Sequence, residues 1–228
     1  MVYNNTMKNT IAHRFFTEEE VLQIKSIFSE NIAKRGFENN EDCTYVDMNN
    51  VIEQQHLGRF VIKTQYSTDG LSEIPLPESI LRKVDEYVEQ NNMYDVPMSR
   101  VGATFVRYDK KYGVPNLGPH VDLSHCAIIV DYQLESNIDW ALGIEDEVYH
   151  LSDNSFVAFD ALRQYHWRPE QEFEEDSYVN LIFFEYANTD LNAVENKEEL
   201  KKAEFVRDIY SQYLTVKKNG RLENSRIV

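Results

Sequence analysis

The chain has 228 residues, of which 42% are hydrophobic, so it fits a folded protein with one sizeable core and excludes an intrinsically disordered chain. Its formal net charge of −16 argues against binding to nucleic acid and against docking on an anionic membrane, since both need a basic protein surface. The two cysteines, Cys43 and Cys126, are too few for a disulfide framework, and we expect a cytoplasmic protein with neither signal peptide nor membrane span.

The sequence of residues 1–99 predicts helices and strands that pack against the rest of the chain and support it. An arm over residues 1–16 enters a first strand near Ile11. Thr17-Glu18-Glu19-Glu20 is a capping box, in which the Thr hydroxyl and the third Glu satisfy free amides at a helix start. The helix that follows ends at Gly36 and presents an apolar stripe of Val21, Ile24, Phe28 and Ile32. A second helix is expected over about residues 78–90, with Leu81, Val84 and Val88 on one face.

Between residues 100 and 186 the pattern changes to short β-rich runs that are separated by polar turns. The predicted strands are 101–108, 125–133, 140–144, 147–151, 156–160 and 178–186. Many short strands at close spacing are typical of a jelly roll or barrel. For residues 187–228 we expect a C-terminal helical extension, with a helix over 195–217. The predicted fold class is therefore mainly β with flanking helices, in a single domain over residues 1–228.

A metal site is suggested by His120, Asp122 and His166. On a β-strand, His120 and Asp122 would point to the same side, because side chains alternate with a period of two. Gly118 and Pro119 place His120 at a strand opening, and His166 follows an apolar strand and a short loop. Two imidazoles and one carboxylate leave several coordination positions of a bound metal ion open, an arrangement that suits non-haem Fe(II).

Other interpretations of these residues stay open. His120 and Asp122 would also be compatible with a hydrogen-bonded surface pair, and His166 with a core histidine. His125 is a rival ligand, although its odd offset from His120 favours the opposite face of a regular strand. His150, His13 and His56 carry no motif, and we interpret them as structural.

Arg168 is the strongest candidate for binding a carboxylate beside the metal. Pro169 favours an extended Arg168, so Arg168 and His166 would face the same way, and the guanidinium fork matches a carboxylate. The alternative is a salt bridge to a glutamate within residues 170–175. Tyr108, which would otherwise be an aromatic core residue, and Arg107 are further candidates on a neighbouring strand. Tyr112 and Asn116, in the loop that enters the site, are candidate substrate contacts.

In this order the motifs resemble the Fe(II)/2-oxoglutarate-dependent oxygenases, in particular the prolyl-4-hydroxylase-like branch. The similar segments are Phe105-Val106-Arg107-Tyr108, Gly118-Pro119-His120-Val121-Asp122, Phe156-Val157-Ala158-Phe159-Asp160 and His166-Trp167-Arg168. The resemblance covers about residues 100–186. It implies a double-stranded β-helix core and iron ligation by His120, Asp122 and His166.

The chain departs from the family where the family commonly carries a basic residue about ten positions after the distal histidine. Here that region reads Glu174-Glu175-Asp176-Ser177-Tyr178. Arg168 is the candidate replacement for binding 2-oxoglutarate, and Arg163, Arg107 and Lys110 are open alternatives.

The implied function is a dioxygenase that uses Fe(II), 2-oxoglutarate and O2 to hydroxylate a C–H bond of a small-molecule or peptidyl substrate, with release of succinate and CO2. The competing functions are a zinc-dependent hydrolase built on the same three ligands and a non-catalytic jelly-roll binding module.

Overall fold

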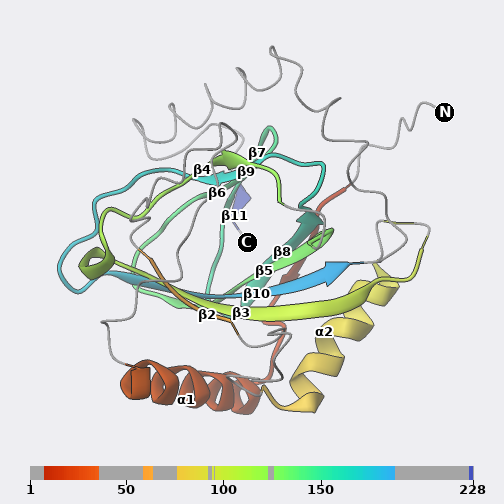
Figure 1. Ribbon diagram of the computed structural model, residues 1–228, viewed down its shortest axis with the longest axis horizontal. Coiled ribbons are helices and arrows are strands. Elements are labelled where there is room, and N and C mark those ends of the chain that lie inside the picture. The colour runs from red at the N-terminus through yellow and green to blue at the C-terminus, as the bar shows by residue number, and fades with distance from the viewer. Residues whose placement is uncertain are drawn as a thin grey trace.

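The computed structural model describes residues 8–35, 59–63, 76–91, 94, 96–122, 126–187 and 226–227. Two β-sheets face each other, and two helices cover the outer side of the larger sheet (Figure 1). The helices are α1 (Glu18–Arg35) and α2 (Glu78–Gln90). Neither these nor any other described segment forms a helix long and apolar enough to cross a membrane.

The larger sheet has six strands in the order β1-β8-β5-β10-β3-β2, and all neighbours are antiparallel. Its strands are β1 (Thr10–His13), β2 (Arg59–Lys63), β3 (Ser99–Asp109), β5 (Ile128–Ser136), β8 (Ser155–Asp160) and β10 (Tyr178–Ala187). The N-terminal segment therefore contributes strands directly to the sheet that carries the central part of the chain.

The smaller sheet has five strands in the order β11-β7-β6-β9-β4. These are β4 (Leu117–His120), β6 (Leu142–Ile144), β7 (Glu147–His150), β9 (His166–Arg168) and β11 (Arg226–Ile227), with a 3-10 turn, η1 (Lys110–Tyr112), before β4. Gly143 on β6 pairs with Trp167 on β9. A Cβ atom at position 143 would lie 2.0 Å from the Trp167 ring, so only glycine fits beneath this indole.

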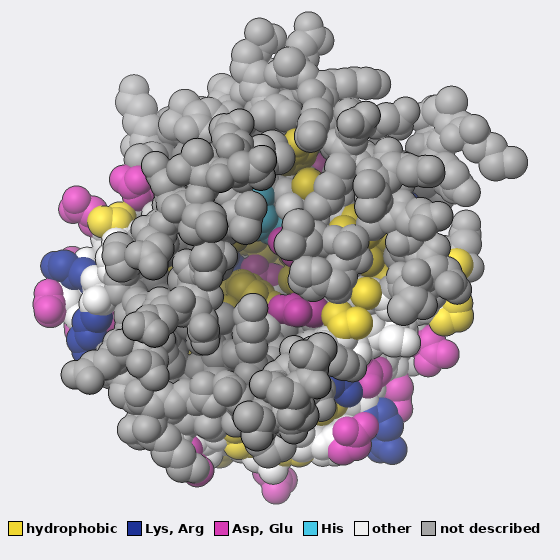
Figure 2. Space-filling view, viewed as in Figure 1, with side chains coloured by type: hydrophobic (Ala, Val, Ile, Leu, Met, Phe, Trp, Pro, Cys, Tyr) yellow, Lys and Arg dark blue, Asp and Glu magenta, His cyan; other side chains and the backbone are white. Residues whose placement is uncertain are grey.

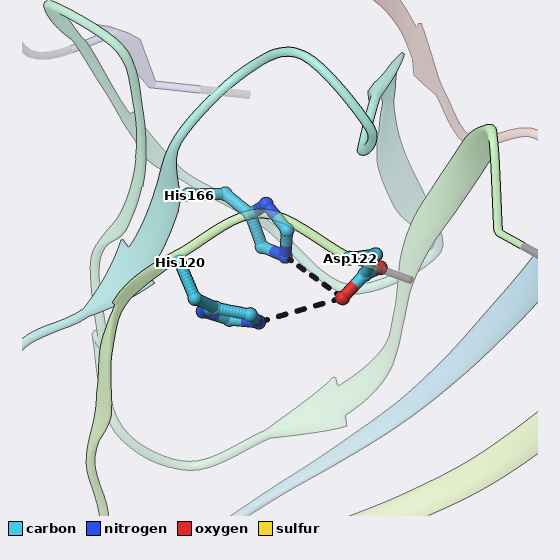
Figure 3. A group of neighbouring side chains, drawn as sticks. All are labelled: His120, Asp122 and His166. Carbon is cyan, nitrogen blue, oxygen red and sulfur yellow. Dashed lines mark ion pairs between the residues drawn. The ribbon is translucent and has the colours of Figure 1, made fainter. Parts of the chain in front are cut away.

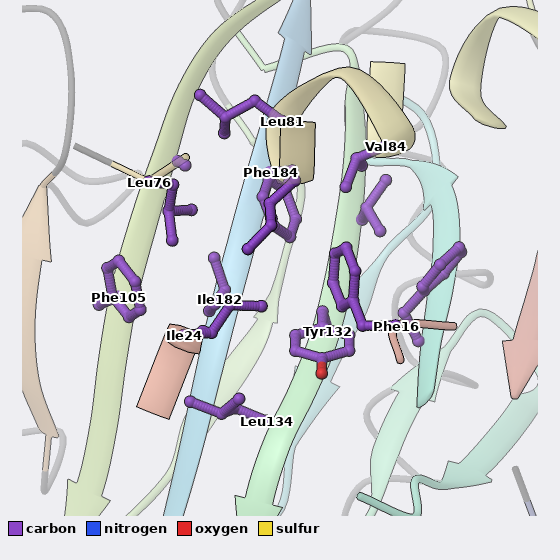
Figure 4. Close-up of a cluster of buried hydrophobic side chains, with 14 of the residues drawn as sticks. Phe16, Ile24, Leu76, Leu81, Val84, Phe105, Tyr132, Leu134, Ile182 and Phe184 are labelled. Atoms are coloured by element: carbon purple, nitrogen blue, oxygen red, sulfur yellow. The ribbon is translucent and has the colours of Figure 1, made fainter. Parts of the chain in front are cut away.

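The main apolar core lies between the larger sheet and the two helices (Figure 4). Alternate residues of β3, β5 and β10 point to this outer side, among them Phe105, Tyr132 and Ile182. Ile24 of α1 and Val84 of α2 pack against them. The capping box at the start of α1 is confirmed: Thr17 N donates to Glu20 Oε2 at 2.7 Å, and Glu20 N donates to Thr17 Oγ1 at 3.3 Å.

The residues between these positions point to the inner side, toward the smaller sheet. Ile129, Val157 and Phe159 belong to one inner cluster, and Tyr108 and Leu181 belong to a second. Asp131 lies between Ile129 and Gln133 on the same side of β5, opposite Phe183 of β10. The inner side of the larger sheet thus carries a buried charge among apolar residues, and the outer side carries the main apolar core.

The predicted fold class is confirmed: the chain is mainly antiparallel β, with a jelly-roll core and flanking helices. The strand β2 was not predicted, and β4 is a short strand where only a strand opening was expected. The predicted C-terminal helix over 195–217, the helix end at Gly36, and residues Cys43, His56 and His125 lie outside the described residues. The single-domain assignment stays a prediction.

Candidate metal centre

His120, Asp122 and His166 converge on one point between the two sheets (Figure 3). One ligand atom from each residue lies within 4.8 Å of the others. The Nε2 atoms of His120 and His166 are 3.5 Å and 3.7 Å from Asp122 Oδ1. Figure 2 shows a patch of histidine beside acidic and hydrophobic side chains near the centre of the viewed face.

Strand pairing brings the two histidines together. His120 at the end of β4 is the direct antiparallel partner of His166 at the start of β9. Directly opposed residues of an antiparallel pair project to the same face, so both rings point inward. Their ring centroids are 4.2 Å apart, and Phe159 from the larger sheet packs on the His166 ring at 4.9 Å.

Asp122 reaches the site in a different way from the one predicted. The predicted common side of His120 and Asp122 assumed that both lie on one β-strand, but β4 ends at His120. The backbone N of Asp122 instead donates to the carbonyl of Ala161 at 2.8 Å, and Ala161 N donates to Ala127 O at 3.0 Å. These bonds fix the segment after β4 against the turn after β8, and so place the carboxylate opposite the two imidazoles.

Both imidazoles are oriented by backbone carbonyls. His120 Nδ1 lies 2.8 Å from Gly118 O, and His166 Nδ1 lies 3.2 Å from Gln164 O. A carbonyl only accepts hydrogen bonds, so the proton of each neutral ring is on Nδ1 and the lone pair is on Nε2. The two lone pairs therefore face the Asp122 carboxylate, as metal ligation requires.

Burial also keeps the His166 imidazole neutral, which is the form that can bind a metal. Desolvation, with a smaller contribution from His120 nearby, lowers the pKa of His166 to about 4. The ring is then neutral at physiological pH. Two imidazoles and one carboxylate suit a divalent transition metal and leave the other coordination positions open, so the residues fit Fe(II).

Arg168 lies two residues after His166 on β9 and has an exposed fraction of 0%. The predicted extended conformation is confirmed. Its guanidinium pairs with Asp131 of β5 at 2.9 Å, not with a glutamate of residues 170–175. The pair joins the two sheets in the interior. Arg168 also lies over the Trp140 ring, with its Cζ atom 5.1 Å from the ring centroid.

Tyr108 and Arg107 point to opposite sides of β3. Tyr108 is fully buried on the inner side, with its ring centroid 4.5 Å from that of Trp140. Arg107 points to the outer side, where it pairs with Asp109 at 3.0 Å and donates to Asn180 at 3.2 Å. This position argues against Arg107 as a cosubstrate ligand, because the sheet separates its side chain from the triad.

The other candidates lie around the edge of the site. Asn116 donates to the carbonyl of Val114 at 2.9 Å, in the segment between η1 and β4. Tyr112 belongs to η1, and its side chain is outside the described residues. Lys110 pairs with Glu175 at 3.2 Å on the surface, and Arg163 lies 3.6 Å from Asp160. His150 at the end of β7 binds Asp139 at 2.7 Å, away from the triad's residues.

Asp131 is a buried charged residue that the sequence prediction missed. Its signal was visible: one carboxylate interrupts the apolar run Ile128-Ile129-Val130-Asp131-Tyr132 of a central strand. A charge at such a position needs a partner, because an unpaired buried charge is very costly. The partner, Arg168, is distant in the sequence, so the pairing itself was not predictable.

Comparisons with known proteins agree on the fold. No family model and no curated protein matches the chain. A prolyl hydroxylase from Trichoplax adhaerens, solved with a hypoxia inducible factor peptide fragment, has a TM-score of 0.57 at 14% identity, over 86% of each chain.

Two bacterial proteins are also similar. An oxidoreductase of the 2OG-Fe(II) oxygenase family from Burkholderia pseudomallei has a TM-score of 0.51 at 12% identity, over 78% of this chain and 84% of its own. AviO1 from Streptomyces viridochromogenes Tue57 has a TM-score of 0.52 at 12% identity, over 80% of this chain and 90% of its own. These similarities establish that the chain has the fold of such oxygenases.

Proposed function

We propose that this chain is a non-haem Fe(II)- and 2-oxoglutarate-dependent dioxygenase. It would hydroxylate an unactivated C–H bond of an amino acid, a small metabolite or a protein side chain, with release of succinate and CO2. The observation that carries the proposal is the convergence of His120, Asp122 and His166, with both imidazole lone pairs directed at one carboxylate inside an oxygenase-like fold.

The triad would hold the ion on one side only. Bound Fe(II), together with 2-oxoglutarate, supplies the oxygen chemistry, and the protein supplies position and a shaped, dry surrounding. Asp122 contributes the single negative charge of the ligand set. Phe159 packs on His166 and excludes water from one side of that ligand.

Arg168 and Tyr108 would bind the far carboxylate of 2-oxoglutarate. Arg168 follows His166 by two residues, so both side chains lie on the inner side of β9, and Arg168 is more buried than any residue of the triad. Tyr108 and Arg168 both contact the ring of Trp140, so their side chains lie near each other. A guanidinium and a phenol are suitable donors for a carboxylate.

The substrate class is proposed more broadly. Tyr112 and Asn116 lie in the segment that leads into β4, and we propose them as substrate contacts. One structural neighbour was solved with a peptide, which supports a peptidyl substrate as well as a small molecule. Nucleic acid and membrane partners are not proposed, and a cytoplasmic location stays a prediction.

The decisive experiment is anaerobic addition of Fe(II) and then 2-oxoglutarate to the purified protein. We expect a weak visible metal-to-ligand charge-transfer band that needs both additions, followed by succinate release when oxygen and a substrate are supplied. Absence of the band in a protein that contains stoichiometric zinc would instead support a hydrolase. A protein that binds neither metal would support a non-catalytic binding module.

A further inference from the structure

The Asp131–Arg168 pair connects the two sheets next to the triad, and it is almost completely shielded from solvent. The side-chain exposed fractions are 4% for Asp131 and 0% for Arg168. Asp131 comes from β5 of the larger sheet and Arg168 from β9 of the smaller sheet. Each charge is therefore compensated across the interior and not by water.

The hydrogen bonds of Arg168 leave part of its guanidinium unused. Nη2 donates to both oxygens of Asp131, at 3.1 Å and 2.9 Å. Nη1 makes a longer bond, 3.3 Å, to the carbonyl of Trp140. Nε is buried and makes no hydrogen bond to any residue that the structure describes. Asp131 thus holds the guanidinium by one end, and a donor remains for a second acceptor.

Charge makes Asp131 a competitor of any carboxylate that binds there. A second carboxylate at Arg168 would share one cation with Asp131, and the repulsion between two desolvated anions weakens such binding. Without Asp131, the buried guanidinium would be uncompensated, and an anionic ligand would restore neutrality. The same residue therefore stabilises the empty site and opposes its occupation.

We propose that Asp131 is a built-in counter-ion that occupies Arg168 before the cosubstrate binds and so sets the affinity and selectivity for a dicarboxylate. This inference rests on the proposed function, because it takes 2-oxoglutarate as the ligand of Arg168. Asp131 is a positioning residue: it acts through Arg168 and belongs to neither the metal ligands nor the reacting groups.

Asp131→Asn tests the inference, because asparagine keeps an acceptor for Arg168 Nη2 and removes the charge. Calorimetric titration of the Mn(II)-loaded protein compares 2-oxoglutarate with 2-oxopentanoate, which has the same chain length without the far carboxylate. We expect the Kd for 2-oxoglutarate to fall about tenfold in the variant, with the Kd for 2-oxopentanoate unchanged. We also expect a lower Tm without ligand and a larger ligand-induced rise in Tm.

Asp109→Asn is the matched control. Asp109 is also a buried carboxylate paired with an arginine of the same sheet, Arg107 at 3.0 Å, but it lies on the outer side. This variant should lose stability without any change in the Kd for 2-oxoglutarate. If Asp131→Asn does not fold, the double variant Asp131→Asn/Arg168→Gln, which removes both charges, should fold and bind the two ligands with similar affinity.

The outcomes separate the two proposals. If the wild-type protein binds Mn(II) and 2-oxoglutarate but Asp131→Asn binds 2-oxoglutarate equally or more weakly, the counter-ion role is wrong and the proposed function stands. A double variant that still prefers 2-oxoglutarate overturns the inference and the assignment of Arg168 as carboxylate anchor, but not the proposed dioxygenase activity. If the folded wild-type protein binds Mn(II) but not 2-oxoglutarate, the proposed function is wrong and the inference with it.

Discussion

The two sides of the six-stranded sheet are built from the same strands but are chemically different. On the outer side, Phe105 and Ile182 pack against the helices in a mostly apolar core. On the inner side, Asp131 occupies a central strand position, and the sheet faces a triad of ionisable residues. A buried ion pair stabilises a fold less than apolar residues of similar size would. The packing against the helices lies on the outer side, and the residues that we propose for the chemistry face the inner side.

Two aspartate–arginine pairs, one on each side of the larger sheet, repeat this contrast. Arg107 on the outer side retains 19% exposure of its side chain and binds Asn180 as well as Asp109. Arg168 on the inner side is fully buried and has a donor without a partner among the described residues. The first guanidinium is satisfied and partly hydrated, whereas the second is dry and incompletely bonded, as a ligand-binding group would be.

The largest expected effect is on the inner side, at Asp122, the proposed anionic metal ligand. Asp122→Asn removes the anionic ligand of the triad, and we expect metal affinity to fall at least about a hundredfold, more than the loss of a residue that only orients a ligand. Metal content after dialysis and titration with Mn(II) measure the change. The control is His150→Gln, which alters a histidine that binds Asp139. Equal metal content in Asp122→Asn and wild type would remove the triad assignment.

The next effect is on the outer side, at Phe105. This residue is fully buried, with its ring centroid 5.1 Å from that of Phe28 in α1. Phe105→Ala should lower the free energy of unfolding by about 3–5 kcal/mol through lost burial and a cavity. Urea denaturation followed by circular dichroism measures it. If the two sides of the sheet have separate roles, the folded variant should keep the Mn(II) affinity of the wild type. A large loss of Mn(II) affinity would argue against separate roles.

The smallest effect concerns Glu145, in the turn between β6 and β7. Its carboxylate accepts a hydrogen bond from Tyr165 N at 2.7 Å, and burial raises its pKa from 4.5 to about 7. Between these values the folded protein binds more protons than the unfolded chain. The free energy of unfolding therefore falls as the pH rises from about 4.5 to about 7.

Glu145→Gln keeps the acceptor and removes this titration. Above pH 7 the variant should be more stable than the wild type by about 1–2 kcal/mol, an effect that partial solvent screening keeps modest. Urea denaturation at several pH values from 5 to 8 measures the difference. Parallel stability curves for the two proteins would show that Glu145 is not the group responsible.

Much of the fold followed from local pattern. The helix predicted over residues 78–90 and the capping box before α1 are local features, and both are confirmed. Most predicted strands lie within a few residues of the observed ones. The strand β2 was missed, and its pairing with β3 depends on residues distant in the sequence.

The sequence indicated His120, Asp122 and His166 as one group, and the structure brings them together, whereas their role as metal ligands stays a prediction. The spacing of His120 and Asp122 indicated a common face, but a bond from Asp122 N to Ala161 O, and not a regular strand, places the carboxylate. Arg107 and Tyr108 are adjacent in the sequence, and only the orientation of β3 decides which one faces the interior. Long-range pairs such as Asp131 and Arg168 depend on how two sheets stack, which a single sequence does not encode locally.

The close contact between Gly143 and the Trp167 ring links β6 to the two residues that flank this tryptophan in β9, His166 and Arg168. Trp167 lies between His166 and Arg168 in β9, and its ring lies where a side chain at position 143 would have to be. Adding a single methyl group there would displace the indole and, through the backbone, shift an imidazole and a guanidinium together. A substitution at position 143 would therefore change the spacing between His166, a proposed metal ligand, and Arg168, the proposed cosubstrate anchor, without altering either residue.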